Sequence, residues 1–374
     1  MSAVPNRLTL RHRSLCSRLA EHSLDALLVT HPPNIAYLTG LQASAGAVLA
    51  AAGTIYLVID SRYSTVATAL AASASAPEGL QVVPVQASYD ETIQTVLRRA
   101  ECRHVGVESE SVSIRRWNWL NDGLDGSEVM LTPVEGLVEA GRIVKDEQEV
   151  ATFREAGQLI AGAVVPILRL VRTGRSEREI AADLDLTLSR HGFEDRAFPT
   201  IVASGPNSAL PHAHPSARCV EPGDLVLLDF GGVYGGYCVD VSRTVCVEPV
   251  GAKAAQFHAA VLDAQQKAIA AVRPGLVASE VDAVARSALA EKGLADAFGH
   301  GTGHGLGLEI HEAPRVGQKG QPGADAVLEP GMVFTVEPGV YVPGAGGVRI
   351  EDDVLVTGDG CEVLTDAPRG LAIE

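Results

Sequence analysis

The sequence predicts an α/β (α+β) protein of two domains, and three observations support this prediction. The chain has 374 residues, which exceeds the usual size of a single hydrophobic core. Helical and strand patterns alternate over residues 1–140, and the remainder contains a repeated pattern. We therefore expect an N-terminal α/β domain at 1–140 and an internally duplicated domain at 141–374.

The N-terminal domain is expected to begin with a helix near residues 7–22. Residues 45–59 are apolar, but they are too short for a membrane span and are interrupted by glycines. They fit a hairpin that turns near Gly53 better. The expected strands are 26–30, the two arms of 45–59, 82–85 and 105–107. Strands that alternate with helices predict a layered α/β domain.

Two capping boxes predict helix starts in the C-terminal domain. They are Asp-Glu-Gln-Glu at 146–149 and Ser-Glu-Arg-Glu at 176–179. Pro166 is expected to kink or divide the first helix, because proline removes one intrahelical hydrogen bond. The second helix is expected to end at Gly192.

A pattern of residues around this second helix recurs about one hundred residues later. Val171, Arg172, Gly174, Glu179, Leu188 and Gly192 match Val272, Arg273, Gly275, Glu280, Leu289 and Gly293, each at an offset of 101. Two alanine-rich helices can resemble each other by chance. The offset holds across the glycines at both ends, however, so we favour an internal duplication.

Two aspartates flank a glycine-bearing turn in the first half of this duplication. Asp229 and Asp240 lie in apolar runs on either side of residues 234–236, which is typical of a β-hairpin. With Tyr234 and Gly235 as the two-residue loop, the aspartates would be directly opposed. Two carboxylates in that position destabilise a hairpin unless a cation lies between them. A metal ion is the obvious cation.

The duplication predicts a second acidic hairpin, and the sequence contains one. Glu337 and Glu351 lie symmetrically about Gly344 in a glycine-rich turn between two apolar runs. One such pair alone would more often be surface or turn chemistry. Four carboxylates in two related hairpins instead predict one site with a charge of −4, which two divalent cations would neutralise.

Three histidines precede the second hairpin in a glycine-rich segment: His300, His304 and His311. The glycines allow backbone and ligand to approach closely. The zinc signature HExxH is absent, because no histidine follows His311-Glu312 at the required spacing. Oxygen ligands with one imidazole suit Mn, Co or Zn, and the hardness of the oxygens favours Mn.

Together these residues resemble the pita-bread metallopeptidases, in the branch of prolidase (Xaa-Pro dipeptidase) and aminopeptidase P. The resemblance covers about residues 146–370. Residues 1–140 resemble, more loosely, the creatinase-type N-terminal domain of that branch. The motifs that carry the resemblance are Leu-Pro-His at 210–212, Asp229 to Asp240, His300 to Pro314, Thr335 to Gly339, Gly347 to Asp352, Pro33 to Gly40 and Asp60 to Tyr63.

The resemblance implies five metal ligands: Asp229, Asp240, His304, Glu337 and Glu351. Asp240 and Glu351 would bridge two divalent ions. Two close cations lower the pKa of a bridging water, and the resulting hydroxide would attack the Xaa-Pro bond of a dipeptide or a peptide N-terminus. Glu337 would also accept the proton.

The resemblance also implies roles for residues beside the ligands. His311 would stabilise the charge on the carbonyl oxygen. His212 would contact the substrate, with His214 as the competing candidate. His300 and Arg349 would orient substrate or ligands, although Arg349 could equally be a structural counter-ion. Glu312 and Asp352 are expected to be structural.

Two alternatives compete with Xaa-Pro hydrolysis. A methionine aminopeptidase-like enzyme of the same fold generally lacks a separate N-terminal domain, which disfavours this alternative. A binding protein on a former peptidase fold is disfavoured because all five ligands are intact.

The composition limits the partners that we expect. A net charge of −16 and a pI near 5.1 argue against nucleic acid, which needs a basic face. The six cysteines include no CxxC pair, and residues 1–13 lack the apolar run of a signal peptide, so we expect a reduced, cytoplasmic protein. We expect a small peptide with proline in second position as substrate, no membrane contact, and a homodimer.

Overall fold

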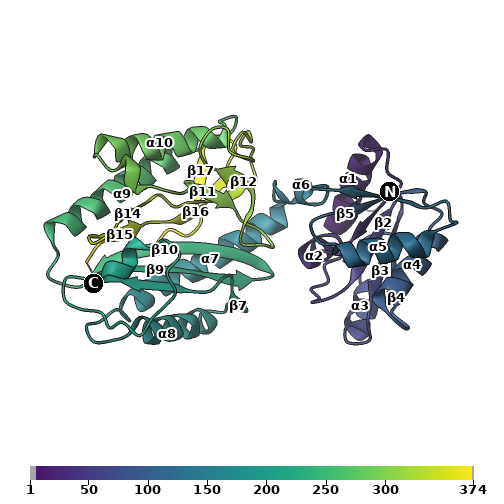
Figure 1. The fold of residues 1–374 in the computed structure, drawn as a ribbon, viewed down its shortest axis with the longest axis horizontal. Helices are drawn as coiled ribbons and strands as arrows, with labels where there is room; N and C mark the ends of the chain where they lie inside the picture. The colour runs from purple at the N-terminus through teal and green to yellow at the C-terminus, as the bar shows by residue number, and fades with distance from the viewer. Residues whose placement is uncertain (1–5, 373–374) are drawn as a thin grey trace. The chain divides into compact units, whose positions relative to one another are not determined.

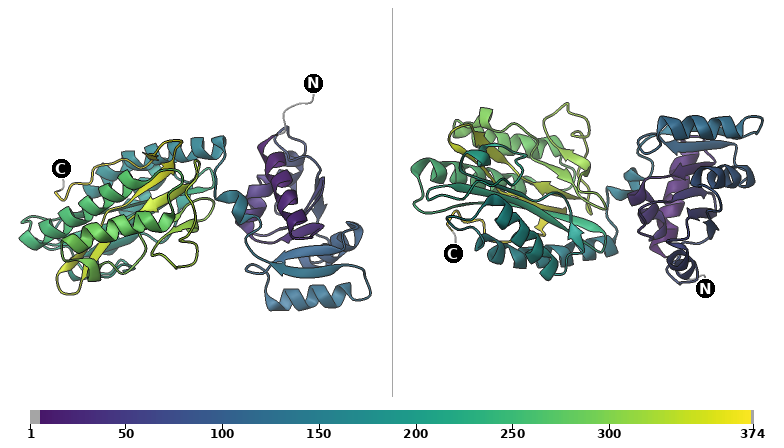
Figure 2. Two further views of the ribbon diagram at one scale, coloured as in Figure 1. Left: turned by 90° about the horizontal axis from the view of Figure 1, so that it is seen from above. Right: turned by 60° about the horizontal axis from the view of Figure 1, so that its bottom comes forward.

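The computed structural model describes residues 6–372, and the chain divides into two compact units between Arg142 and Ile143. Residues 1–5, part of the segment tested for a signal peptide, lie outside the described residues. Among the residues described, no helix is long and apolar enough to cross a membrane. Figures 1 and 2 show the helices and strands of both units.

The N-terminal unit is built on one six-stranded sheet in the order β4-β3-β2-β1-β5-β6. Helices α4 and α5 pack on one face of this sheet and α1 on the other (Figure 2). The elements expected from the sequence are all present, including the hairpin at 45–59. Their bounds are α1 Arg7–Glu21, β1 Ala26–Val29, α2 Pro32–Thr39, β2 Ala47–Ala51, β3 Thr54–Ile59, α3 Ser64–Ala71, β4 Leu80–Pro84, α4 Tyr89–Arg99, β5 His104–Glu108, α5 Ile114–Leu124, β6 Met130–Val134 and α6 Glu139–Arg142.

The C-terminal unit places helices outside a central group of antiparallel strands (Figure 1). Its helices are α7 Glu147–Leu168, α8 Glu177–Arg190, η1 Gly205–Ala209, α9 Ala252–Ala271, α10 Ala278–Glu291 and η2 Ala295–Ala297. Its strands are β7 Asp195–Arg196, β8 Ile201–Ser204, β9 Leu225–Tyr234, β10 Tyr237–Cys246, β11 Gly303–Gly305, β12 Glu312–Val316, β13 Val333–Val336, β14 Gly339–Val342, β15 Gly346–Arg349, β16 Asp352–Val356 and β17 Cys361–Val363.

The two halves of the C-terminal unit correspond, as the repeated pattern predicts. Helices α8 and α10 have 14 residues each, and both their starts and their ends are related by the offset found in the sequence. The glycines that flank them, at 174, 192, 275 and 293, all adopt positive φ. Each half also has its own apolar core, α7 and α8 against β9 and β10, and α9 and α10 against β13 to β16.

Both capping boxes form, and their helices begin where the sequence predicts. Pro166 does not divide α7, which continues for two residues to Leu168. Proline is tolerated here because it interrupts only the end of a helix whose buried face is already packed.

The first acidic hairpin, β9 and β10, has a register that differs from the expected one. Tyr234 pairs with Tyr237, so the turn residues are Gly235 and Gly236, with φ of 57° and 82°. This turn type needs positive φ at both central residues, which glycine adopts without strain and tyrosine does not. The assumption of a Tyr234-Gly235 loop was therefore wrong.

The corrected register changes the partners of the two aspartates. Asp229 pairs with Ser242, and Asp240 pairs with Gly231, so the two carboxylates are diagonal neighbours and not directly opposed. The shift is two residues, and side chains alternate with a period of two. Both aspartates therefore still face the same side of the hairpin.

The second acidic hairpin has the expected register. Gly339 pairs with Arg349, and Val336 pairs with Asp352. These pairs enclose Glu337 and Glu351, which are symmetric about Gly344 as predicted. Glu337 lies between the end of β13 and the start of β14, and Glu351 lies between the end of β15 and the start of β16.

Candidate metal centre

A cavity of about 650 Å³ lies in the C-terminal unit at the meeting point of both acidic hairpins. Its volume is in the range typical of small-molecule sites. It is lined by all ten residues that the sequence singled out as ligands, catalytic groups or the competing histidine: Asp229, Asp240, His304, Glu337, Glu351, His212, His214, His300, His311 and Arg349.

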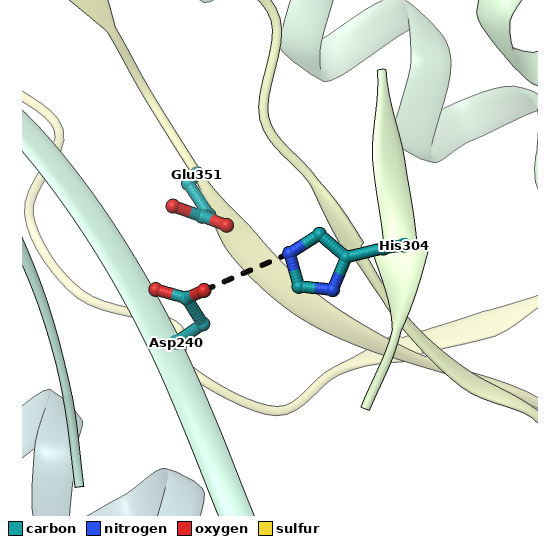
Figure 3. Close-up of side chains that lie close together, drawn as sticks. All are labelled: Asp240, His304 and Glu351. Carbon is teal, nitrogen blue, oxygen red and sulfur yellow. Dashed lines mark ion pairs between the residues drawn. The ribbon is translucent and has the colours of Figure 1, made fainter. Parts of the chain in front are cut away.

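Three of the five expected ligands converge most closely. One potential ligand atom from each of Asp240, His304 and Glu351 lies within 4.8 Å of the others. Figure 3 shows these side chains, from β10, from β11 and from the residue before β16, pointing toward one another. The Nε2 atom of His304 lies 3.8 Å from Asp240 Oδ2 and 3.7 Å from Glu337 Oε1.

The imidazole of His304 is held in an orientation suited to metal binding. Its Nδ1 lies 3.0 Å from the carbonyl oxygen of Gly305, to which it can donate. Nε2 then carries the lone pair that faces the carboxylates. Burial, followed by the nearby His311, lowers the pKa of His304 to about 4. The ring is thus neutral, which is the form that ligates metals.

Several carboxylate oxygens at the site are free to bind a metal ion. Among the described residues, Asp229 Oδ1, Asp240 Oδ1 and Glu351 Oε1 are buried oxygens without a hydrogen-bond partner. Such atoms are costly to bury unless a cation or donor satisfies them. Burial, and then neighbouring carboxylates, raise the pKa values of Asp240 and Glu351 well above normal. This donor set fits divalent cations.

Arg349 lies beside the acids, on the face expected from its alternation with Glu351. Its side chain is buried, and its guanidinium donates to Asp229 Oδ2 and, over 2.9 Å, to Ser242 Oγ. These contacts support the counter-ion alternative. Arg349 also lines the cavity, so a contact with substrate is compatible with the same position.

Tyr341 completes this group and was missed in the sequence. Arg349 Nη1 donates to its hydroxyl over 2.7 Å, and the hydroxyl lies 3.0 Å from His300 Nε2. A strand repeats its face every second residue, so the spacing from Glu337 through Gly339 to Tyr341 could have indicated a shared face.

The remaining histidines line the cavity without direct bonds to the expected ligands. His212 and His214 are both exposed, and the geometry favours neither as the substrate contact. The ring of His311 lies edge-on to His304, with 4.3 Å between centroids. His300 Nδ1 donates to Gly301 O over 2.8 Å, and its Nε2 lies 3.0 Å from the hydroxyl of Tyr341.

Two acidic residues near the ligands have other partners. Asp352 is fully buried and accepts from Arg243, Arg369 and Gln265. Glu312 lies 3.8 Å from Lys145 Nζ. Both contacts agree with the structural roles expected.

Asp353 was not anticipated from the sequence. It accepts the backbone N–H of Asp240 over 3.0 Å. It therefore joins the strand that carries Asp240 to the segment that carries Glu351.

Comparison with known proteins extends this picture to the whole chain. Residues 151–358 match the metallopeptidase family M24, and residues 11–144 match the creatinase/prolidase N-terminal domain. An Xaa-Pro dipeptidase of Pyrococcus furiosus is 33% identical over 96% of this chain and 99% of its own length.

Solved structures agree with the same architecture. An Xaa-Pro dipeptidase from Bacillus anthracis superposes with a TM-score of 0.92 at 36% identity, covering 98% of this chain and 99% of that one. An X-Pro aminopeptidase from Thermotoga maritima gives a TM-score of 0.85 at 32% identity, covering 95% and 99%. The predicted fold class and family are confirmed: the chain belongs to metallopeptidase family M24 and carries a creatinase/prolidase-type N-terminal domain.

Proposed function

We propose that this metallopeptidase hydrolyses the bond before proline in Xaa-Pro dipeptides. The observation that carries the proposal is the convergence of Asp240, His304 and Glu351 within 4.8 Å, at a cavity with unpartnered carboxylate oxygens. The proline preference is supported by the Xaa-Pro dipeptidases of P. furiosus and B. anthracis, which this chain resembles over nearly its full length.

Five residues would hold two divalent cations: Asp229, Asp240, His304, Glu337 and Glu351. Asp240 and Glu351 would be the ligands shared by both ions, as the resemblance to the prolidase branch implies. Each has one buried oxygen without a hydrogen-bond partner among the described residues, as does Asp229. The predominance of oxygen donors favours Mn, with Co or Zn as alternatives. When bound, such ions activate water as a nucleophile and polarise the carbonyl under attack.

Glu337 would accept the proton released when water attacks. Burial raises its pKa to about 7, and its carboxylate borders the cavity beside His304. A carboxylate at this place in the cavity can take up a proton from an attacking water.

The surrounding side chains would hold the substrate. His311 and either His212 or His214 border the cavity, and in this proposal they donate to the carbonyl oxygen of the scissile bond. Burial, followed by the charge of Arg349, lowers the pKa of His300 to about 4. His300 is therefore neutral and orients Tyr341 and, through it, Arg349.

An aminopeptidase P-type activity on longer peptides is the second candidate. The likeness to the T. maritima X-Pro aminopeptidase, at a TM-score of 0.85, favours it. The two activities are separated by measuring proline release from Xaa-Pro against peptide release from Xaa-Pro-Xaa-Xaa, with Mn, Co and Zn compared and Xaa-Ala as control. If no metal supports cleavage of either proline substrate, the proposed function is wrong.

We also propose that the protein is a cytoplasmic homodimer. All six cysteines are free thiols, which is usual for proteins of a reducing compartment. The homodimer rests on the resemblance to the prolidase branch. Light scattering of the purified protein would give twice the chain mass of 39.1 kDa if this is correct, and the single chain mass if it is not.

A further inference from the structure

Glu177, the first residue of α8, is a fully buried carboxylate outside the metal centre. Its Oε1 accepts from the backbone N–H and the hydroxyl of Ser204, over 2.7 and 2.8 Å. Its Oε2 accepts from the backbone N–H and the hydroxyl of Ser216, over 2.9 and 2.6 Å. The side-chain amide of Asn207 donates to both oxygens.

These contacts join the two ends of one loop. Ser204 ends β8, Ser216 lies twelve residues later, and the segment between them carries His212 and His214 to the cavity. The loop is attached at its tip as well, because Arg349 Nη1 donates to the carbonyl oxygen of Pro211 over 3.3 Å. The Glu177 carboxylate thus holds together the two ends of the loop 204–216, which carries both histidines.

The protein maintains Glu177 as an anion in spite of its burial. Burial alone would raise the pKa, but the hydrogen bonds from Ser216, Ser204 and Asn207 outweigh it and hold the pKa below its usual value. Arg218, the nearby cation, donates to Ser204 Oγ and forms its ion pair with Asp224. Charge-assisted hydrogen bonds are stronger than neutral ones, so an ionised Glu177 holds the loop more firmly than an amide could.

The second half of the duplication has a comparable contact at a different place. Asp282, on α10, accepts the backbone N–H and hydroxyl of Thr302 over 3.0 and 2.8 Å, between His300 and His304. By the repeat offset, Glu177 corresponds to Ala278 and Asp282 corresponds to Ala181. The two halves thus use one buried carboxylate each, one turn apart on corresponding helices. Asp282 holds the segment that carries His300 and His304, and Glu177 holds the loop that carries His212 and His214.

We propose that Glu177 is a positioning residue for catalysis, which sets the place of His212 and His214 against the substrate without contributing to metal binding. The proposal rests on the proposed function in assigning substrate contact to this loop. It predicts that loss of the carboxylate changes catalysis and loop order while the metal centre stays intact.

The test replaces Glu177 by glutamine, which keeps the side-chain shape but turns one acceptor into a donor that faces donors. We expect kcat/KM on Xaa-Pro to fall roughly 10- to 100-fold, since small displacements of contacting groups cost about that much. The Mn affinity, from equilibrium dialysis, should stay within about twofold, because no ligand in the proposed set is touched. Hydrogen exchange of the segment around Ser204 and Ser216 should accelerate.

A matched control is Glu179→Gln, two residues along the same helix. This carboxylate is exposed and accepts from the backbone N–H and the hydroxyl of the helix cap Ser176. This variant should keep wild-type kinetics. If Glu177→Gln does not fold, Ser216→Ala is the second variant. It removes one of the donors to Glu177, together with the oxygen that accepts the backbone N–H of Arg218. It should lower kcat/KM at least roughly fivefold, the equivalent of one hydrogen bond.

The positioning role would be overturned if a folded Glu177→Gln variant kept the wild-type kinetic constants. It would also be overturned if this variant lost Mn affinity by the same factor as kcat/KM. Unchanged kinetics in Ser216→Ala would do the same if the glutamine variant fails to fold. A wild-type enzyme that cleaves no proline substrate would instead refute the proposed function. In that case the hydrogen exchange of residues 204–216 would still test whether Glu177 holds this loop in place.

Discussion

The two acidic hairpins bring carboxylates to one cavity by different means. In the first, β9 and β10 form an uninterrupted ladder of ten paired residues, and Asp229 and Asp240 are diagonal neighbours within it. In the second, the ladder is interrupted between β13–β16 and β14–β15, and Glu337 and Glu351 lie opposite each other at the interruption.

The backbone bonds explain how the second hairpin tolerates its interruption. The N–H of Glu337 donates to Thr302 O over 2.7 Å, and the N–H of Glu351 donates to Ser242 O of the first hairpin over 3.1 Å. Both groups are thus satisfied by neighbouring segments, as buried backbone requires. The first hairpin thus carries short aspartates on a continuous ladder. The second carries longer glutamates, and the bond from Glu351 N–H to Ser242 O connects it to the first.

The largest effect should come from removing one carboxylate of either hairpin. Asp240→Asn or Glu351→Gln should lower kcat/KM by about 1000-fold or more, because metal ions contribute several kcal/mol to transition-state stabilisation. Bound Mn should fall while the circular dichroism spectrum stays close to that of the wild type. Full activity in either variant would refute the ligand assignment.

The neighbour of Glu351 should affect stability more than chemistry. Asp352→Asn weakens a fully buried network with Arg243, Arg369 and Gln265, so unfolding free energy in urea should drop by about 3–5 kcal/mol. Asp366→Asn is the control, because Asp366 pairs with the same Arg369 but is mostly exposed. It should cost less than about 1 kcal/mol. Similar losses of unfolding free energy in both variants would show that the buried network of Asp352 is no more important for stability than the exposed ion pair of Asp366.

The sequence predicted more about the second hairpin than about the first. In the second hairpin, placing the centre of the glycine-rich turn at Gly344 was enough to predict that Glu337 and Glu351 lie opposite each other. In the first hairpin, the choice between two overlapping loops depended on positive φ at two positions, and the Gly235-Gly236 pair was the signal that decided it.

Contacts between distant segments were the part that the sequence could not predict. The periodicity of the strand placed Arg349 beside the acids, but its pairing with Asp229 depends on how the two hairpins pack. The same holds for the contact of Asp353 with Asp240 and for the Glu177 contacts, which join residues 27 and 39 positions apart. Side-chain hydrogen bonds of this kind leave no periodic pattern.

The stability that metal adds to the protein should depend on pH, because the carboxylates of both hairpins bind protons as well as metal. Burial raises the pKa of Glu337 from 4.5 to about 7 in the folded state, so the folded protein binds more protons than the unfolded one between these values. Stability of the metal-free protein should therefore fall as pH rises through this window.

Thermal melts at pH 5 and pH 7, with EDTA or with Mn, would check this expectation. Because cations favour the ionised carboxylates, the increase in Tm on adding Mn should be larger at pH 7 than at pH 5. An equal increase at both pH values would show that these carboxylates are not coupled to metal.

The smallest effects should come from the turns. Gly344→Ala and Gly235→Ala place a side chain at φ of 76° and 57°, which should cost about 1 kcal/mol each and lower Tm by a few degrees. Activity should be unchanged, because the register is also fixed by the buried faces of both strands. A loss of metal in either variant would show that the turn itself sets the ligand geometry.

The central claim is that both hairpins serve one metal centre, and X-ray diffraction at the Mn absorption edge from crystals grown with Mn tests it most directly. We expect two anomalous peaks per chain among Asp229, Asp240, His304, Glu337 and Glu351, with Asp240 and Glu351 in contact with both. Peaks confined to one hairpin, or none at these residues, would contradict the claim.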